Sequence, residues 1–209
     1  MTDGDDDLNA AYALKTPEDS KRLYGAWAES YDTGFADELA YRLPEHVAEA
    51  LAARSPNGPI LDIGAGTGLV GLALSALGLG PVDGTDISQE MLDKAAQKDV
   101  YQRLFTGDMT KRLPVNDGAY NAVVSSGTFT TGHVGPEALD EVLRIAATGA
   151  LIAISISEAH WEAAGFRSKF DSLVGKIHDF ELVPVQIYGA EAKHEHADDR
   201  GNIALFYKA

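Results

Sequence analysis

Residues 60–71 read ILDIGAGTGLVG, and the four glycines of this stretch fit two different spacings. Counted from Gly64, three of them form G-x-G-x-G, and the acidic residue Asp62 stands two positions ahead. Counted from Gly66, three of them form G-x-G-x-x-G, which is the spacing of a dinucleotide-binding turn. Glycine lets the backbone turn sharply and a ligand approach closely in both arrangements, so the glycines alone do not identify the ligand.

The chain around this turn alternates between apolar strands and amphipathic helices. Residues 59–63 form a short apolar strand that runs into the turn, and the next helix places Val70, Leu74 and Leu77 on one face. Further strands are expected at 81–87, 101–108, 120–126, 150–157, 180–188 and 202–208. The last two have no helix between them and predict an antiparallel hairpin. The pattern indicates an α/β fold: a single doubly wound, mostly parallel seven-stranded sheet with a C-terminal antiparallel hairpin and an N-terminal helical extension.

Helix signals fill the gaps between these strands. Ser88 is expected to cap the helix that follows the second strand. Gly135 and Pro136 open a helix whose apolar residues recur at i, i+3, i+4 and i+7, ending with Ala146. One further helix is expected near residues 158–173.

The N-terminal part divides into a tail and a helical segment. Residues 1–15 are rich in aspartate and have little to bury, which predicts a disordered acidic tail. Thr16 followed by Pro17 is typical of a capped helix start. We therefore expect one folded domain over residues 16–209, in which residues 16–58 form a helical lid or extension.

The composition argues against several classes of protein. With 17 Lys and Arg against 32 Asp and Glu, the formal charge of the chain is −15, which repels nucleic acid and anionic membranes. No cysteine is present, so disulfides, thiolate metal sites and cysteine nucleophiles are excluded. The start of the chain is acidic rather than basic, and no apolar run approaches the length of a membrane span. We expect a soluble, cytoplasmic protein that binds neither nucleic acid nor membranes.

Three features favour the spacing that begins at Gly64. The expected strand 59–63 ends directly at this glycine, whereas Gly71 falls inside the following helix. An acid at Asp62 has no function in dinucleotide binding, but a carboxylate favours a ligand that carries a sulfonium and an ammonium group. A terminal hairpin also departs from a dinucleotide fold, which continues as strand, helix and strand. The spacing therefore indicates S-adenosylmethionine and methyl transfer rather than NAD or FAD and hydride transfer.

Several ordered motifs carry a family resemblance. Over residues 20–209 the chain resembles the class I S-adenosylmethionine-dependent methyltransferases, and shorter stretches resemble the Williams–Beuren-region methyltransferase-like proteins. The class I motifs are DIGAGTG at 62–68, GTDIS at 84–88, GDM at 107–109 and the terminal hairpin; the narrower branch is resembled by WAESYD at 27–32 and SSGTFTTGHVGPEALDEVLRI at 125–145.

The resemblance implies a cofactor site for S-adenosylmethionine, with S-adenosylhomocysteine as product. Asp62 would orient the cofactor ammonium, Asp86 would accept the ribose hydroxyls and Asp108 would accept the adenine amino group. Asp62 could alternatively cap the amides of the turn, and Met91 could be plain core. The residues expected at the cofactor are Asp62, Gly64, Ala65, Gly66, Thr67, Gly68, Asp86, Ile87, Met91, Asp108, Met109, Ser125 and Tyr31.

The lid supplies the last of these residues. Tyr24, Trp27 and Tyr31 recur at i, i+3 and i+7, one face of a helix. Tyr31 is the expected contact to the cofactor, and the other two are assigned to the core.

His133 is the one histidine expected near the methyl acceptor, where it could act as a general base or simply bond to its own loop. Trp161 and Phe166 could wall the acceptor site or belong to the core. His194 and His196 lie beside two aspartates, and a solvated loop is preferred to a metal site.

The acceptor is expected to be a small molecule. SSGT at residues 125–128 stands where enzymes that methylate nucleobases or amide nitrogens carry an N-P-P-Y motif, and the acidic charge agrees. Two other functions stay open: a protein of this fold that binds S-adenosylmethionine without catalysis, and an NAD-dependent oxidoreductase.

Overall fold

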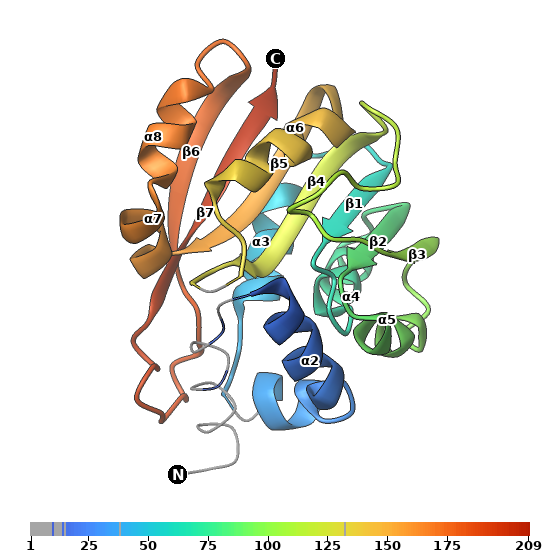
Figure 1. The fold of residues 1–209 in the computed structure, drawn as a ribbon, viewed down its shortest axis with the longest axis vertical. Helices are drawn as coiled ribbons and strands as arrows, with labels where there is room; N and C mark the ends of the chain where they lie inside the picture. Colours follow the sequence, from blue (N-terminus) through green and yellow to red (C-terminus); the bar gives the residue numbers. More distant parts are fainter. Residues whose placement is uncertain (1–9, 11–13, 15, 38, 132) are drawn as a thin grey trace.

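The computed structural model describes residues 10, 14, 16–37, 39–131 and 133–209, so most of the expected tail at residues 1–15 lies outside the described residues. One seven-stranded sheet runs through the described chain in the order β3-β2-β1-β4-β5-β7-β6 (Figure 1). The strands are β1 Ile60–Ile63, β2 Val82–Asp86, β3 Arg103–Thr106, β4 Tyr120–Phe129, β5 Ala146–Ser157, β6 Ile177–Gln186 and β7 Arg200–Lys208.

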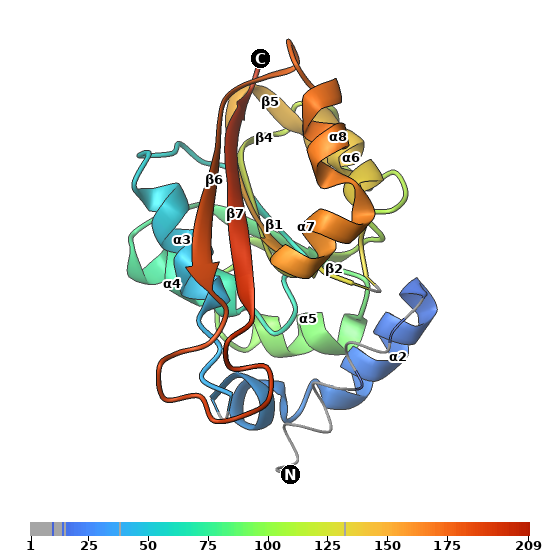
Figure 2. The ribbon, with the colours of Figure 1, turned by 90° about the vertical axis from the view of Figure 1, so that its left-hand side faces the viewer.

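Helices cover both faces of this sheet, with α3 and α4 on one side and α6, α7 and α8 on the other (Figure 2). The α-helices are α2 Pro17–Trp27, α3 Leu43–Ala52, α4 Leu69–Ala76, α5 Gln89–Ala96, α6 Leu139–Ile145, α7 Glu158–Ala164 and α8 Phe166–Ser172. Two short turns complete the set, the π-helical turn η1 Tyr31–Asp37 and the 3-10 turn η2 Pro136–Ala138. None of the helices in the described ranges is long and apolar enough to span a bilayer.

The expected parallel core and terminal hairpin are confirmed. β1 pairs in parallel with β2 and with β4, and β5 pairs in parallel with β4. The hairpin β6–β7 joins the sheet antiparallel to β5. The carboxyl ends of β1, β2, β3, β4 and β5 therefore meet at one edge, where ligands bind in sheets of this kind.

The spacing that begins at Gly64 is the one that shapes the turn. β1 ends at Ile63, and Gly64, Gly66 and Gly68 follow with φ values of 69°, 54° and 93°. This left-handed region is open to glycine and costly for most other residues. Gly71 instead lies buried inside α4, where its amide donates to the Tyr101 hydroxyl at 3.1 Å.

The N-terminal segment begins as expected and then departs from the prediction. The Thr16 hydroxyl accepts the Asp19 amide at 3.1 Å and caps α2. The helix ends at Trp27, however, and Tyr31 opens η1 instead of continuing the same face. The Tyr24 and Tyr31 rings still meet, with centroids 6.1 Å apart, because the chain turns back.

Three further expectations need correction. The helix predicted near 158–173 is two helices, because Gly165 has a left-handed φ of 81° that ends α7. Ala146 is buried but opens β5 rather than closing the preceding helix. Leu77 is 46% exposed, because α4 ends at Ala76 and Leu77 does not continue its buried face.

Replacing Gly71 by alanine tests the packing beneath the turn. The added methyl group would overlap the Tyr101 ring, which two hydrogen bonds hold in place, so we expect a loss of about 1–3 kcal/mol in the free energy of unfolding. Gly25→Ala in α2 is the matched control, because its methyl group would meet the flexible end of Glu90 and the Ser88 hydroxyl at ordinary contact distances of 3.4 to 3.8 Å. Urea denaturation measures both, and equal stability of the two variants would contradict this account.

Candidate active site

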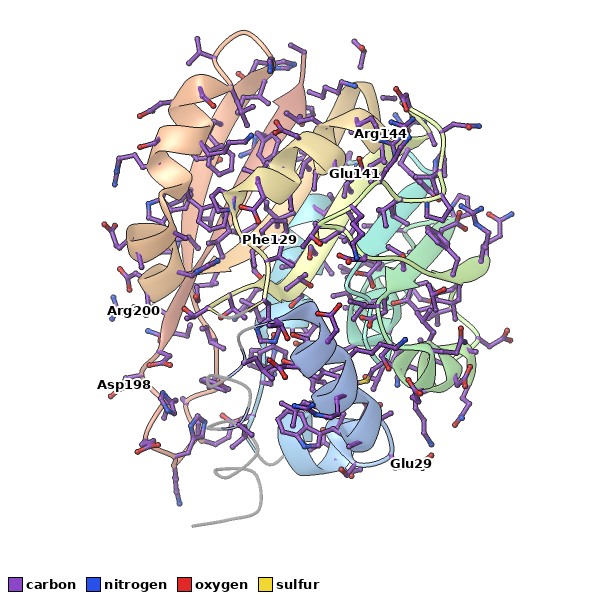
Figure 3. All side chains as sticks on the ribbon, in the orientation of Figure 1. Glu29, Phe129, Glu141, Arg144, Asp198 and Arg200 are labelled. Carbon is purple, nitrogen blue, oxygen red and sulfur yellow. The ribbon has the colours of Figure 1, made fainter. Side chains whose placement is uncertain are left out.

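A cavity opens at the carboxyl edge of the sheet, beneath α2 and η1. Its first half is built by the ends of β1, β2 and β3 and by α5, through Ile63, Gly64, Gly66, Thr85, Asp86, Ile87, Met91, Gly107, Asp108, Met109 and Thr110. Its second half is built by the lid, β4, β5 and the hairpin, and includes Tyr24, Tyr31, Tyr41, Leu43, Ser126, Phe129, Thr130, His133, Ser155, Ser157, Ile187 and Tyr188. Phe129 lies at the end of β4 in the middle of the molecule (Figure 3). Of the described residues that line the cavity, none is a lysine or arginine.

The end of β2 holds the glycine turn. The amides of Gly64 and Ala65 both donate to the Thr85 carbonyl, at 2.8 and 3.0 Å. The Asp86 carboxylate accepts the amides of Gly66 and Ser88, each at 2.9 Å. Burial raises the pKa of Asp86, and these two backbone hydrogen bonds oppose the rise. Asp86 thus lies in the cavity wall with a carboxylate already oriented by the backbone.

Asp62 lies beneath the turn and not in the cavity wall. Its side chain is fully buried, and one carboxylate oxygen accepts the Tyr101 hydroxyl at 2.7 Å. The other oxygen, Oδ1, is buried without a hydrogen-bond partner among the described residues. Burial raises the pKa of Asp62 to about 7, the Tyr101 hydrogen bond lowers it, and the nearby Asp86 raises it further.

The segment after β3 presents Asp108 to the cavity. The Asp108 carboxylate accepts the Thr110 amide at 2.9 Å and pairs with Lys111 at 2.8 Å. Burial raises the pKa of Asp108, but its hydrogen bonds to Lys111 and Thr110 outweigh this and leave the pKa below the usual value.

A half-buried ion pair on α6 fixes the rest of that segment. Arg144 donates to Glu141 at 2.6 and 2.8 Å and to the carbonyls of Leu113 and Val115. Glu141 in turn accepts the Leu113 amide at 2.6 Å. Figure 3 shows the two labelled side chains side by side on α6. This clamp was not predicted, because the two charged side chains of α6 bind backbone groups of Leu113 and Val115, some 30 positions away.

Ion pairs and backbone pairing attach the N-terminal helical segment to the glycine turn, to α5 and to the hairpin. Asp32 accepts the Thr67 hydroxyl of the glycine turn and pairs with Lys98, both at 2.5 Å. Glu29 pairs with Lys94 on α5 at 2.6 Å. On the far side, the backbone at Tyr41 pairs with that of Tyr188, where the lid meets the hairpin.

The predicted cofactor residues divide between the cavity wall and its support. Those in the wall are Gly64, Gly66, Asp86, Ile87, Met91, Asp108, Met109 and Tyr31. Asp62, Ala65, Thr67, Gly68 and Ser125 do not line the cavity and lie behind it. The Ser125 hydroxyl, for example, donates to the Ile63 carbonyl at 2.7 Å and ties β4 to β1.

His133 lines the second half of the cavity together with Tyr24, which the sequence assigned to the core. Its Nε2 is 2.9 Å from the Tyr24 hydroxyl, and its Nδ1 is 3.2 Å from the Thr131 carbonyl. Burial lowers the pKa of His133 from the usual value, the Thr131 hydrogen bond raises it, and His160 lowers it further. The aromatic spacing in α2 predicted that Tyr24 lies on a packed helix face. It did not show that this face turns toward the cavity.

Other candidates take structural roles. Trp161 and Phe166 stack on each other in the core and do not line the cavity. His196 pairs with Asp199 at 3.1 Å, and no cluster that could ligate a metal occurs among the residues described.

The cavity wall suits S-adenosylmethionine. A side chain at Gly66 would extend into open space on the cavity side, so the absence of one leaves room for a ligand against the backbone. Asp86 at the end of β2 and Asp108 at the end of β3 offer carboxylate acceptors, and Ile87 and Met91 add apolar surface between them. The Oδ1 of Asp62 leaves a buried polar atom behind the turn that has no hydrogen-bond partner among the described residues.

The raised pKa of Asp62 allows the effect of its burial to be tested by varying the pH. Its pKa in the folded protein, about 7, exceeds the usual value for an aspartate, so its contribution to stability is present at low pH and is lost as the pH rises through 7. Relative to Asp62→Asn, the wild type should lose on the order of 2 kcal/mol in unfolding free energy between pH 5 and pH 8. Denaturation of both proteins across this range measures the difference; a constant difference would mean that Asp62 titrates normally.

Comparison with known proteins agrees with this geometry. A family profile described as a methyltransferase domain matches residues 60–149. The human methyltransferase-like protein 27 is 32% identical over 153 residues, 71% of this chain and 62% of the human protein. A bovine 18S rRNA (guanine-N(7))-methyltransferase is 42% identical over 66 residues, 32% of this chain and 23% of the bovine protein. The solved structure of a TehB-like SAM-dependent methyltransferase from Corynebacterium glutamicum matches with a TM-score of 0.60 and 22% identity, covering 93% of this chain and 100% of that one.

These matches differ in how much of each protein they cover and in what they support. The chain spans 62% of the length of the human relative, and the solved structure, at 22% identity, is evidence for the fold alone. The profile match includes the glycine turn and Asp86, and the sheet order with its terminal hairpin is that of the matched fold. Residues 60–149 therefore match a methyltransferase domain, and the described fold is that of the class I S-adenosylmethionine-dependent methyltransferases.

Proposed function

We propose that this protein transfers a methyl group from S-adenosylmethionine to a small-molecule acceptor. The observation that carries the proposal is a single cavity with two chemically different halves, one with backbone and carboxylates for the cofactor and one with tyrosines and hydroxyl groups. When bound, the cofactor supplies a methyl group on a sulfonium centre. The protein has to align the acceptor with that group and exclude water.

The cofactor would lie along the ends of β1, β2 and β3. Gly64 and Gly66 would face its methionine part, Asp86 its ribose hydroxyls, and Asp108 with Met109 its adenine. Tyr31 would cover it from the lid. Asp62, Thr67, Gly68, Ala65 and Ser125 would act by holding the turn and its neighbouring strands in shape, as their hydrogen bonds and burial suggest.

Residues 16–58 would act as a lid over both ligands. The lid bonds to the glycine turn through Asp32 and to the acceptor loop through Tyr24, so ligand entry would require these contacts to open. Closing would then exclude water from both halves of the cavity at once.

The acceptor is proposed to be small because the cavity and the chain lack the features of RNA binding. The bovine relative is named for methylation of 18S rRNA, and an RNA acceptor is the alternative. Binding RNA requires cationic side chains near its phosphates. This chain has a formal charge of −15, and the described cavity wall contains no lysine or arginine.

Two other functions stay distinguishable by experiment. A cofactor-binding protein without catalysis would bind S-adenosylhomocysteine but methylate nothing. An NAD-dependent oxidoreductase would bind NADH and ignore S-adenosylhomocysteine; the left-handed glycines at 64, 66 and 68 do not favour it.

Calorimetric titration with S-adenosylhomocysteine tests the cofactor site. We expect saturable binding to the wild type and a loss of about 10-fold or more in Asp86→Asn, because a charged acceptor for the ribose hydroxyls is lost. Asp83→Asn, on the same strand but bonded to Arg103 and Tyr120 away from the cavity, should bind like the wild type. Binding of NADH in place of S-adenosylhomocysteine would reject the proposed function.

A further inference from the structure

The Tyr24–His133 pair has a defined direction of hydrogen bonding. The Thr131 carbonyl only accepts, so the His133 Nδ1 that lies 3.2 Å from it carries the proton in the neutral ring. The opposite nitrogen, Nε2, then has a lone pair and accepts the Tyr24 hydroxyl at 2.9 Å. Tyr24 thus donates its own proton to His133, while its oxygen retains lone pairs that can accept another hydrogen bond.

The surroundings keep His133 ready to take up a proton. The titratable groups that face it are Tyr24 on α2 and His160 on α7, and its hydrogen-bond partners among the described residues include no carboxylate. Burial and His160 both lower the pKa of His133, so the ring is neutral near pH 7. A neutral imidazole at a cavity wall is able to act as a base.

Among the described lining residues, the acceptor half of the cavity contains no carboxylate, lysine or arginine, and its one histidine is neutral. The two carboxylates of the described wall, Asp86 and Asp108, lie at the ends of β2 and β3 in the cofactor half. Both are already engaged, Asp86 with backbone amides and Asp108 with Lys111. A charged acceptor would therefore lose its hydration without gaining an ionic partner in its own half.

The walls of this half suit a flat ring. Tyr31, Tyr41, Tyr188 and Phe129 line it from the lid, the hairpin and β4, and aromatic rings pack favourably against one another. Leu43 and Ile187 add apolar surface.

From this arrangement we infer that the methyl acceptor is an uncharged phenol, and that its hydroxyl proton passes through Tyr24 to His133. The inference rests on the proposed function. As the acceptor oxygen bonds to the methyl carbon, the carbon–sulfur bond breaks and sulfur keeps the electron pair. The phenol proton moves to the Tyr24 oxygen, the Tyr24 proton moves to His133 Nε2, and the products are a neutral methyl ether and an imidazolium.

We infer a hydroxyl rather than an amine as the acceptor group because the site offers a path for the hydroxyl proton. A hydroxyl oxygen that gains a methyl group must lose its proton to give a stable product, whereas a free amine can attack without a base. A tyrosine whose proton is held by a neutral histidine provides that outlet, and Tyr24 is the residue that would touch the acceptor.

Binding of matched probes tests the acceptor class. Protein saturated with S-adenosylhomocysteine is titrated with 4-ethylphenol, with tyramine as its ammonium analogue and with 3-(4-hydroxyphenyl)propionate as its carboxylate analogue. The neutral phenol should bind at least about 10-fold more tightly than either charged analogue. Protein with S-adenosylmethionine should convert 4-ethylphenol to its methyl ether, detected by mass spectrometry, and should leave 4-ethylaniline unmethylated.

Variants test the proton path. Tyr24→Phe and His133→Gln should each lower kcat about 100-fold or more with little change in KM or in affinity for S-adenosylhomocysteine. In the wild type kcat should fall on the acid side as His133 takes up a proton, and this limb should be absent in His133→Gln. Tyr207→Phe and His178→Gln are matched controls, because these two rings also contact each other, here by stacking, but lie on the hairpin and do not line the cavity.

The outcomes separate failure of the acceptor class, of the proton path and of the cofactor site. If S-adenosylhomocysteine binds but the phenol neither binds nor reacts, or a charged analogue or the aniline is preferred, the inference is wrong while the cofactor site stands. An unchanged acid limb in His133→Gln overturns the proton path. If S-adenosylhomocysteine fails to bind, the proposed function fails and the inference fails with it.

Discussion

The hydrogen bonds between the glycine turn and the end of β2 are the constraint on which the site depends. Because β1 and β2 run parallel in register, Ile63 lies beside Thr85, and the Thr85 carbonyl can accept two successive turn amides. Asp86 then accepts the amide of Gly66. The turn is thereby shaped by the neighbouring strand, and the same carboxylate that supports it faces the cavity.

Other parts of the site attach to this turn. Beneath it, Tyr101 joins Asp62 to the amide of Gly71 and so ties β1 to α4. Above it, Asp32 joins the lid to Thr67. A lid that bonds to the turn itself couples the closing of the cavity to the geometry of the cofactor half, which is useful where water must be kept out.

The acceptor half is held by a different set of contacts. The backbone at Tyr41 pairs with that at Tyr188, Ser155 accepts the Gly127 amide at 3.0 Å, and Tyr24 bonds to His133. These contacts come from the N-terminal helical segment, the hairpin and β4–β5. One cavity can therefore combine a shared cofactor with an acceptor pocket particular to this chain.

The residues in the cofactor half were readable from the sequence because each reflects a local requirement. A left-handed backbone requires glycine at 64, 66 and 68, buried parallel strands require apolar runs, and Ser88 caps α5 through a hydrogen bond three residues away. The break after Trp27 and the division at Gly165 were missed, because helical spacing continues through both points while the tertiary packing does not.

Only the tertiary structure decided what faces the cavity. Tyr24 and His133 are 109 positions apart, and the Arg144 clamp reaches residues some 30 positions away, so no local pattern marks either contact. Asp62 was expected to orient the cofactor ammonium or to cap the amides of the turn, whereas in the fold it accepts the hydroxyl of Tyr101, 39 residues further on, and lies behind the cavity wall. The sequence determined the fold and the turn, since these follow from short-range backbone preferences. Which side chains meet at the acceptor depends on how distant segments pack, and that is settled only when the chain is folded.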